Sequence, residues 1–309
     1  QQQQQQHEQH QRRPWRVWIK VDGGYHRAGV AVAHVAALAT SVAATDGVVL
    51  VGLYIHAGHS YAAHDDDDCL RYARDEVAAA TAAAAAVATV VDASIAIAIG
   101  STPTCSALMH AVERGERVEM GAVTELHPGN YVLYDCQQLA AGACTRADVA
   151  CGVRTTVLSH YRRADRGADV RADVALVDAG SYAMSKDTAR HASVPTDAPT
   201  CFGLVRSIAA AAAPTNSDDD VQMMLVRPSQ ECGQVVPYPS AVGDLAFDTI
   251  AIGSVVEVVP NHACLTAKGF AEYYAVDGSG AIVDRYVPNR GWRLQFDGVG
   301  GGGGGDGGG

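Results

Sequence analysis

The stretch VVLVGLYIHAG, from Val48 to Gly58, decides the fold of this chain. Its unbroken run of aliphatic and β-branched residues is typical of a strand that is buried on both faces of a sheet. Other runs of the same character lie at 17–22 (VWIKVD), 95–100 (IAIAIG) and 130–135 (NYVLYD). Alanine-rich stretches of helical character lie between them, at 31–44, 72–91 and 105–115. Such alternation predicts parallel strands joined by helical crossovers, hence a barrel or a doubly wound sheet.

The character of the sequence changes after about Ala140. Five later segments have strand character, with turn signals between them and no long amphipathic helix: 151–161, 174–180, 221–233, 254–260 and 273–286. We therefore predict an α/β domain over 15–140 and a β-rich domain over 141–297. The glutamine-rich segment 1–14 and the glycine tail 298–309 are expected to be disordered. Two further stretches, 162–173 and 209–220, are expected to be surface loops.

Composition excludes several classes of function. The chain carries a formal net charge of −11 and no basic stripe with interleaved aromatic residues, so we expect no nucleic-acid partner. Its eight cysteines include no CxxC pair, which favours reduced, mostly buried thiols in a reducing, cytoplasmic compartment. No apolar run reaches the length that spans a bilayer, and the run of glutamines at the start has no secretory signal. We therefore expect no membrane partner.

Four consecutive aspartates, Asp65–Asp68, stand immediately before a helical stretch. Carboxylates in that position suit the positive end of the helix dipole. A metal-binding role for the run is the alternative.

The segment from Ile99 to Thr104 follows an apolar strand and opens a helix. Backbone amides and three hydroxyl groups converge there, where a phosphate group could bind against the positive end of the helix. Helix capping explains Ser101 or Thr102 equally well.

His262 and Cys264 form a His-x-Cys pair that follows a Pro-Asn turn. Imidazole nitrogen and thiolate are ligands that zinc prefers, and a spacing of two lets both point to one side of an extended strand. Two protein ligands leave positions open for water or substrate, which is the arrangement of a catalytic zinc. The alternative is a half-buried histidine and a buried thiol on one strand face.

The His-x-Cys pair belongs to the last of a series of ordered sequence blocks that spans most of the chain: 18–30, 51–61, 99–106, 125–135, 177–187, 229–233 and 260–264. Together they resemble the D-serine dehydratase and D-threonine aldolase family, pyridoxal-phosphate enzymes related to alanine racemase. The resemblance implies a partial (β/α) barrel of the alanine racemase type, followed by a β-rich C-terminal domain. It also implies a lyase that converts D-serine to pyruvate and ammonia with pyridoxal phosphate and zinc.

The resemblance assigns roles to individual residues. Arg27 would balance the phenolate or substrate side of the cofactor, and Tyr61 would lie near its ring or the metal-bound water. His56 would stack on the pyridine ring, although a histidine that merely closes a strand is the alternative. The phosphate cradle implied by the resemblance comprises Ser101, Thr102, Gly129, Asn130 and Tyr131.

The metal pair also distinguishes branches of the family. His262 and Cys264 match the zinc pair of the D-serine dehydratases, whereas D-threonine aldolases resemble a His-x-Asp version that suits a harder ion. Cys264 therefore favours a dehydratase over the alternative, an aldolase that cleaves D-3-hydroxy amino acids. One departure from the family is Cys232, which stands in SQECG where relatives resemble SQEHG.

A second departure concerns lysine. The chain has three lysines, Lys20, Lys186 and Lys268, and a pyridoxal-phosphate lyase needs one for its Schiff base. In the family that lysine lies on the first barrel strand, upstream of the block at 18–30. We therefore expect the Schiff-base lysine and the first part of the barrel to be absent. A truncated, non-catalytic family member is the resulting alternative, whereas a complete barrel would imply a homodimer.

Overall fold

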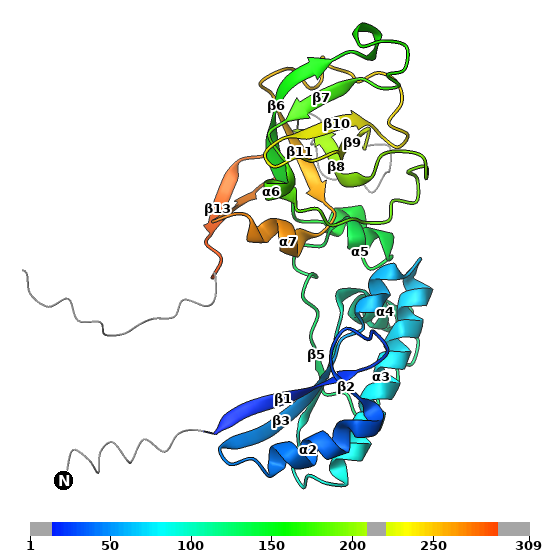
Figure 1. Ribbon diagram of the computed structural model, residues 1–309, viewed down its shortest axis with the longest axis vertical. Coiled ribbons are helices and arrows are strands. Elements are labelled where there is room, and N and C mark those ends of the chain that lie inside the picture. Colours follow the sequence, from blue (N-terminus) through cyan, green and yellow to red (C-terminus); the bar gives the residue numbers. More distant parts are fainter. Residues whose placement is uncertain (1–13, 209–220, 290–309) are drawn as a thin grey trace, which may run out of the picture. The chain divides into compact units, whose positions relative to one another are not determined.

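The computed structural model describes residues 14–208 and 221–289 (Figure 1). By its internal contacts the chain divides into two units, residues 1–269 and 270–309. The first unit contains an open parallel sheet and a closed antiparallel barrel, so the predicted order of an α/β part followed by a β-rich part is confirmed. The predicted disordered ends, apart from Pro14, and the predicted loop at 209–220 lie outside the described residues.

The parallel sheet has the strand order β2-β1-β3-β4-β5, and every neighbouring pair in it is parallel. Its strands are β1 (Trp15–Asp22), β2 (Val30–Ala31), β3 (Val48–Ile55), β4 (Ala96–Ile99) and β5 (Glu125–Leu126). The connecting segments are η1 (Val32–His34), α2 (Val35–Ala43), η2 (Gly58–Ala62), α3 (Asp66–Ala88) and α4 (Thr102–Glu113).

Alanine side chains bring α3 close to this sheet. Ala73 and Ala80 are buried on one helical face and join Leu53, Ile55 and Ile99 in a single apolar core. Small side chains at helical spacing let the helix backbone approach the strands closely. The alanine-rich run is therefore part of the packed core.

The aspartate run begins α3, as predicted. Asp65 accepts a hydrogen bond from the backbone N–H of Asp68 at 2.9 Å and caps the helix. Asp66 also accepts a hydrogen bond from Arg114 at 2.7 Å and pairs with His110, which ties the start of α3 to the end of α4. The carboxylates thus stabilise the positive end of the helix.

The prediction of a strand at 130–135 is wrong. Leu133 and Tyr134 both donate their backbone N–H to the carbonyl oxygen of Asn130 at 2.9 Å, which forms a turn. Tyr134 has a φ of 50°, in the left-handed region that an extended strand does not visit. Tyr131 and Val132 are 54% and 61% exposed, so the aromatic and β-branched residues that suggested a buried strand lie at the surface.

The outer edge of β1 is unpaired along most of its length within residues 14–208 and 221–289. β1 pairs with β3 from Trp15 to Val21, but with β2 only at Val21 and Asp22. Trp15 is 79% exposed beside this edge. Unpaired backbone groups next to apolar side chains form a template for pairing with another chain.

We expect the chain to self-associate through this edge, and Trp15→Lys to reduce the association, because a charge on an edge strand opposes pairing. Light scattering after gel filtration over a range of concentrations measures the effect. Val112→Lys, which places the same charge at an exposed position of α4, should leave the association unchanged. A monomer at all concentrations, or equal association of both variants, would count against this expectation.

The barrel is closed and antiparallel, with the strand order β10-β7-β6-β11-β8-β9. Its strands are β6 (Val153–Tyr161), β7 (Val174–Val177), β8 (Cys201–Ser207), β9 (Met223–Val226), β10 (Gly233–Pro237) and β11 (Val255–Pro260). Short helical elements accompany it: α5 (Cys136–Ala140), η3 (Arg146–Asp148), η4 (Arg163–Asp165), α6 (Ser181–Met184) and α7 (Ala263–Lys268). The predicted surface loop at 162–173 is mostly exposed, as expected, until the chain enters the barrel at Ala172.

All eight cysteines are free, and four of them are buried. Cys69, Cys105, Cys136 and Cys201 are buried, and burial raises the pKa of the Cys69 thiol to about 12. Such thiols behave as small apolar side chains, as predicted. Cys264 differs from these four because it is exposed. No helix among the described residues is long and apolar enough to cross a membrane.

The second unit is described from Phe270 to residue 289. It is a hairpin of β12 (Tyr273–Val276) and β13 (Ile282–Tyr286), paired antiparallel. Asp277 closes its turn by accepting hydrogen bonds from the backbone N–H groups of Ser279 and Ala281 at 2.9 and 3.0 Å.

Candidate active site

The carboxyl ends of β1 and β3 bring Lys20, Tyr54 and His56 together. The Lys20 Nζ atom lies 4.5 Å from the centre of the Tyr54 ring, and the centroids of the Tyr54 and His56 rings lie 6.5 Å apart. His56 Nδ1 lies 2.6 Å from the carbonyl oxygen of Gly100, to which it donates a hydrogen bond. Because the strands are parallel, all of them end at the edge where α/β sheets bind ligands.

The surroundings of His56 favour the neutral form of its ring. Burial lowers its pKa most, and the positive charges of Arg27 and Lys20 oppose its protonation further. Arg27 is exposed in the loop after β1, with its guanidinium carbon 4.9 Å from the centre of the Tyr25 ring. The pKa of Lys20 is also lowered, first by its own burial and then by the positive charge of Arg27. The structure thus brings the predicted residues Arg27 and His56 within electrostatic reach of one another.

Ser101 and Thr102 lie where β4 turns into α4, and both are nearly inaccessible. The Ser101 hydroxyl caps the helix by accepting the backbone N–H of Thr104, in a reciprocal capping box. The Thr102 hydroxyl oxygen accepts the backbone N–H of Asn130 at 2.9 Å. Internal hydrogen bonds therefore engage both hydroxyl groups, and their predicted role toward a phosphate stays a prediction.

The loop that contains Gly129, Asn130 and Tyr131 lies beside Thr102. Asn130 is buried, whereas Gly129 and Tyr131 are exposed. The Asn130 Nδ2 group donates a hydrogen bond to the Asp135 carboxylate, and its Oδ1 atom is buried without a partner. Of the three predicted residues, the structure therefore holds Asn130 firmly and leaves the other two at the surface.

Glu76 of α3 was not predicted from the sequence. It is 1% exposed and accepts hydrogen bonds from the backbone N–H groups of Ala57 and Gly100, at 2.9 and 3.2 Å, and from the Thr104 hydroxyl at 2.9 Å. Burial raises its pKa to about 7, against the lowering effect of these hydrogen bonds. Glu76 thus joins the ends of β3 and β4 to the start of α4.

Tyr61 lies in η2, within electrostatic reach of both Tyr54 and Cys264. Burial raises its pKa to about 12, and the negative charges of Cys264 and Asp135 act in the same direction. The neighbouring Gln138 amide has the opposite, smaller effect on this pKa. The Tyr61 hydroxyl therefore keeps its proton at neutral pH and can donate a hydrogen bond.

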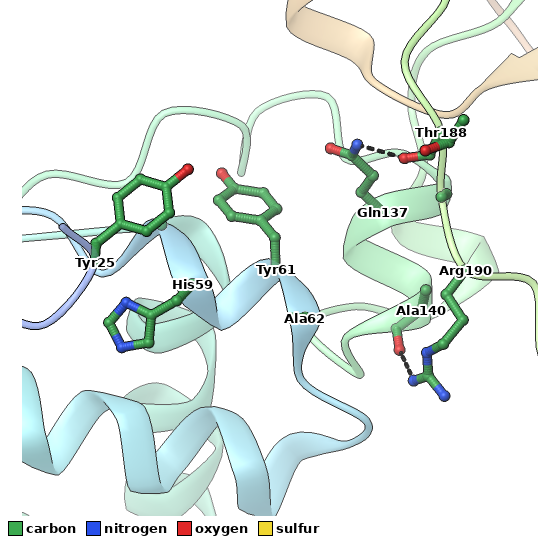
Figure 2. Close-up of a pocket in the computed structure, with 10 residues that line it drawn as sticks. Tyr25, His59, Tyr61, Ala62, Gln137, Ala140, Thr188 and Arg190 are labelled. Atoms are coloured by element: carbon green, nitrogen blue, oxygen red, sulfur yellow. Dashed lines mark hydrogen bonds between the residues drawn. The ribbon is translucent and has the colours of Figure 1, made fainter. Parts of the chain in front are cut away.

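A cavity of about 340 Å³ opens beside Tyr61. Figure 2 shows the hydroxyl groups of Tyr25 and Tyr61 pointing toward one another, with His59 below them. On the far side, Gln137 donates a hydrogen bond to the Thr188 carbonyl oxygen at 2.8 Å. The volume and the polar lining suit a small polar molecule.

His262 and Cys264 lie at the end of β11, where the chain turns into α7. His262 is the residue that precedes the helix and Cys264 lies in its first turn, so the pair is not on one strand face as expected. A hydrogen bond with Cys264 nevertheless raises the pKa of His262 to about 9, and Asp187 contributes to the same shift. The turn of the chain, rather than strand alternation, brings nitrogen and sulfur together.

Two carboxylates form hydrogen bonds with this turn. Asp187 Oδ2 lies 2.5 Å from His262 Nδ1 and also accepts a hydrogen bond from Gln137 Nε2 at 3.1 Å. Asp135 Oδ2 accepts the backbone N–H of Ala263, between the two predicted ligands, at 2.8 Å. Neither contact could be predicted from the sequence, because Asp187 and Asp135 lie far from the turn along the chain.

The donor set fits zinc. An imidazole nitrogen and a thiolate are preferred zinc ligands, and a carboxylate bonded to the other ring nitrogen is the usual outer partner of a metal-bound histidine. Within the described part of the chain no cluster of three His, Cys, Asp or Glu side chains is placed to hold a metal, so Cys232 does not complete the pair. Water or substrate would supply the remaining positions.

Several buried polar atoms near the site have no hydrogen-bond partner. They are His59 Nδ1, Asn130 Oδ1 and both amide atoms of Gln138. Buried polar groups are almost always paired, so unpaired ones around a cavity indicate a place for a polar ligand. Together with the cationic Arg27 and the neutral ring of His56, they fit an anionic, planar cofactor such as pyridoxal phosphate.

Known proteins are similar in sequence to most of this chain. The family described as "Putative serine dehydratase domain" matches residues 150–276, and the family described as "Alanine racemase, N-terminal domain" matches residues 1–124. The D-serine dehydratase of Dictyostelium discoideum is 30% identical over 91% of this chain and 65% of its own length. That of Schizosaccharomyces pombe is 32% identical over 91% of this chain and 62% of its own length.

A solved structure agrees with the sequence matches. D-threo-3-hydroxyaspartate dehydratase from Delftia sp. HT23 superposes with a TM-score of 0.71 at 27% identity, over 90% of this chain and 66% of that protein. This chain therefore spans just under two thirds of the length of these relatives.

A parallel α/β sheet followed by an antiparallel barrel defines the class of alanine racemase-like proteins. Within that class, the chain belongs to the D-serine dehydratase and D-threonine aldolase family of pyridoxal-phosphate enzymes.

Proposed function

We propose that this chain contains the metal-binding and cofactor-binding residues of a lyase of the D-serine dehydratase type, which removes the β-hydroxyl group of a small D-amino acid and releases a keto acid and ammonia. The observation that carries the proposal is geometric: Gln137 lines the same cavity as Tyr61 and is linked to His262 by hydrogen bonds through Asp187. The proposed zinc ligands and the residues proposed to bind pyridoxal phosphate would then belong to one site.

A solved relative supports the metal. Two single mutants of D-threo-3-hydroxyaspartate dehydratase have been solved. One replaces a histidine with alanine. The other replaces a cysteine two positions further along with alanine, and it is in a metal-free form. His262 and Cys264 have the same spacing. The thiolate favours zinc over harder ions and thereby favours a dehydratase over an aldolase.

Each of the proposed site residues would have a separate role in the elimination reaction. When bound, pyridoxal phosphate withdraws electrons from the α-carbon, and zinc withdraws them from the β-hydroxyl oxygen. Arg27 would neutralise the cofactor phenolate, and the neutral ring of His56 would support the face of the cofactor. The protonated Tyr61 hydroxyl would donate a hydrogen bond to the departing oxygen.

The amine that must bind the cofactor carbonyl is the remaining requirement. Lys186 and Lys268 are exposed in the segments around the barrel. Lys20 lies at the strand-end edge, but its Nζ atom is positioned over the Tyr54 ring. We therefore expect borohydride reduction of the chain with pyridoxal phosphate to give scattered, sub-stoichiometric adducts, and little pyruvate to be released from D-serine. A stoichiometric adduct on Lys20 with robust turnover would contradict this.

Supplying a free primary amine tests the function itself. With pyridoxal phosphate, zinc and a primary alkylamine, we expect the chain to release pyruvate from D-serine faster than the same mixture without protein. L-Serine should react no faster than in that control mixture, and His262→Ala should abolish the increase. Formation of glycine and an aldehyde from D-threonine instead would favour the aldolase. No increase with either amino acid would contradict the proposal.

A further inference from the structure

The segment Asp135–Ala140 surrounds the His-x-Cys turn with three separate contacts. The backbone N–H of Gln137 donates to the carbonyl oxygen of Asn261, immediately before His262, at 3.1 Å. The Asp135 carboxylate accepts the N–H of Ala263, immediately after it, at 2.8 Å. The chain on both sides of His262 is therefore fixed to α5 and its capping residue.

The third contact reaches the imidazole ring through a relay. Gln137 Nε2 donates to Asp187 Oδ2 at 3.1 Å, and the same oxygen lies 2.5 Å from His262 Nδ1. A second hydrogen bond, from Gln137 Nε2 to the Thr188 carbonyl oxygen at 2.8 Å, fixes the Gln137 amide (Figure 2). Gln137 thus holds the carboxylate that contacts the histidine.

This relay decides which ring nitrogen faces outward. A carboxylate has only acceptor oxygens, so His262 must donate a hydrogen bond from Nδ1 to Asp187. The Nε2 lone pair is then available to a metal, and the negative carboxylate increases the basicity of the ring. Without Asp187, either ring nitrogen could carry the proton.

We propose that Asp187, held by Gln137, is a positioning residue that fixes His262 with Nε2 free to bind zinc. This inference rests on the zinc site of the proposed function. Asp187 acts on the metal only through the His262 ring, and its side chain is 40% exposed, so replacing it does not open the core.

Zinc competition titration with a chromophoric chelator measures the strength of the site in the whole chain. We expect Asp187→Ala to bind zinc roughly 10–100-fold more weakly, as is typical for loss of an outer partner of a metal-bound histidine. Asp187→Asn keeps an acceptor oxygen without the charge, so it should retain part of the affinity, and Gln137→Ala should weaken binding less than Asp187→Ala. Asp244→Ala is the matched control, because Asp244 is an exposed aspartate bonded to Arg163 instead.

Nitrogen-15 NMR of the zinc-loaded chain gives a readout that a merely structural role would not change. In the unaltered chain, the His262 proton should reside on Nδ1, with zinc on Nε2. Asp187→Ala should lose this preference, and Asp187→Asn should keep it.

The outcomes separate the two proposals. Absence of zinc from the unaltered chain would contradict the metal site of the proposed function, and this inference with it. Zinc bound equally well by the unaltered chain and Asp187→Ala, or zinc bound through Nδ1, would overturn the inference alone.

Discussion

Replacing His262 with alanine, or Cys264 with serine, is expected to lower zinc from about one ion per chain to background. Each change removes one of the two proposed protein ligands, so the loss should exceed the roughly 10–100-fold cost of removing an outer partner. Serine keeps the size of the cysteine side chain but offers zinc a hydroxyl group, which ionises far less readily than a thiol. Metal analysis of the purified chains by mass spectrometry measures the outcome.

Matched controls isolate the pair from general effects on folding. Cys232→Ser alters another partly exposed thiol, and His34→Ala alters an exposed histidine before α2. Both variants should keep the zinc content of the unaltered chain. Zinc retained in full by both His262→Ala and Cys264→Ser would remove the metal site from the account.

Glu76→Ala is expected to destabilise the first unit by at least about 3 kcal/mol, since three buried donors lose their acceptor and each costs about 1–3 kcal/mol. Those donors are the N–H groups of Ala57 and Gly100 and the Thr104 hydroxyl. Glu76→Gln keeps one acceptor oxygen at nearly the same size, so its cost should be smaller. Urea unfolding, followed by circular dichroism, measures the free energy of unfolding of each variant.

The stability difference between the unaltered chain and Glu76→Gln should depend on pH. The folded pKa of Glu76 is about 7, above its ordinary value of 4.5, so the folded state favours the protonated form. The contribution of Glu76 to stability is therefore fully present below pH 4.5 and is lost as the pH rises to about 7. The interval between these two pKa values corresponds to a loss of about 3 kcal/mol.

The neutral amide of Glu76→Gln does not titrate, so the variant should gain stability relative to the unaltered chain over that interval. Unfolding curves at several pH values from 4.5 to above 7 give the comparison. A difference that stays constant, or that changes in favour of the unaltered chain as the pH rises, would contradict the assignment.

The strands that could be predicted from sequence are buried ones that consist of a continuous run of aliphatic residues. Val48–Ile55 and Ala96–Ile99 are runs of aliphatic residues, and both form central strands of the parallel sheet. The run at 130–135 has similar residues but lies at the surface in a turn, because Asn130 accepts two backbone hydrogen bonds there. Composition alone does not distinguish a buried strand from an exposed turn with aromatic residues.

The site was predictable only in part, for a related reason. Residue type indicated His56, His262 and Cys264 as candidate site residues, since imidazole and thiolate groups are common in catalysis and metal binding. Asp187 and Gln137 act through contacts with residues that are distant in the sequence. The hydrogen bond of Gln137 to Asn261, for example, joins residues more than a hundred positions apart, so no local sequence pattern predicts such contacts. These contacts exist only once the barrel has closed.

Glu76 did leave a signal in the sequence. It lies three residues after Ala73 and four before Ala80, on the buried face of α3. A single carboxylate on an otherwise apolar helical stripe predicts a buried hydrogen-bond acceptor, because an unpaired charge there would be too costly.

X-ray absorption at the zinc edge reports the atoms bound to the metal in the purified chain, and therefore tests whether His262 and Cys264 bind it. We expect one sulfur at about 2.3 Å and nitrogen or oxygen atoms at about 2.0–2.2 Å in the remaining positions. The sulfur contribution should disappear in Cys264→Ser and persist in Cys232→Ser. Zinc bound without any sulfur, or by several sulfur atoms, would contradict a site formed by His262 and Cys264.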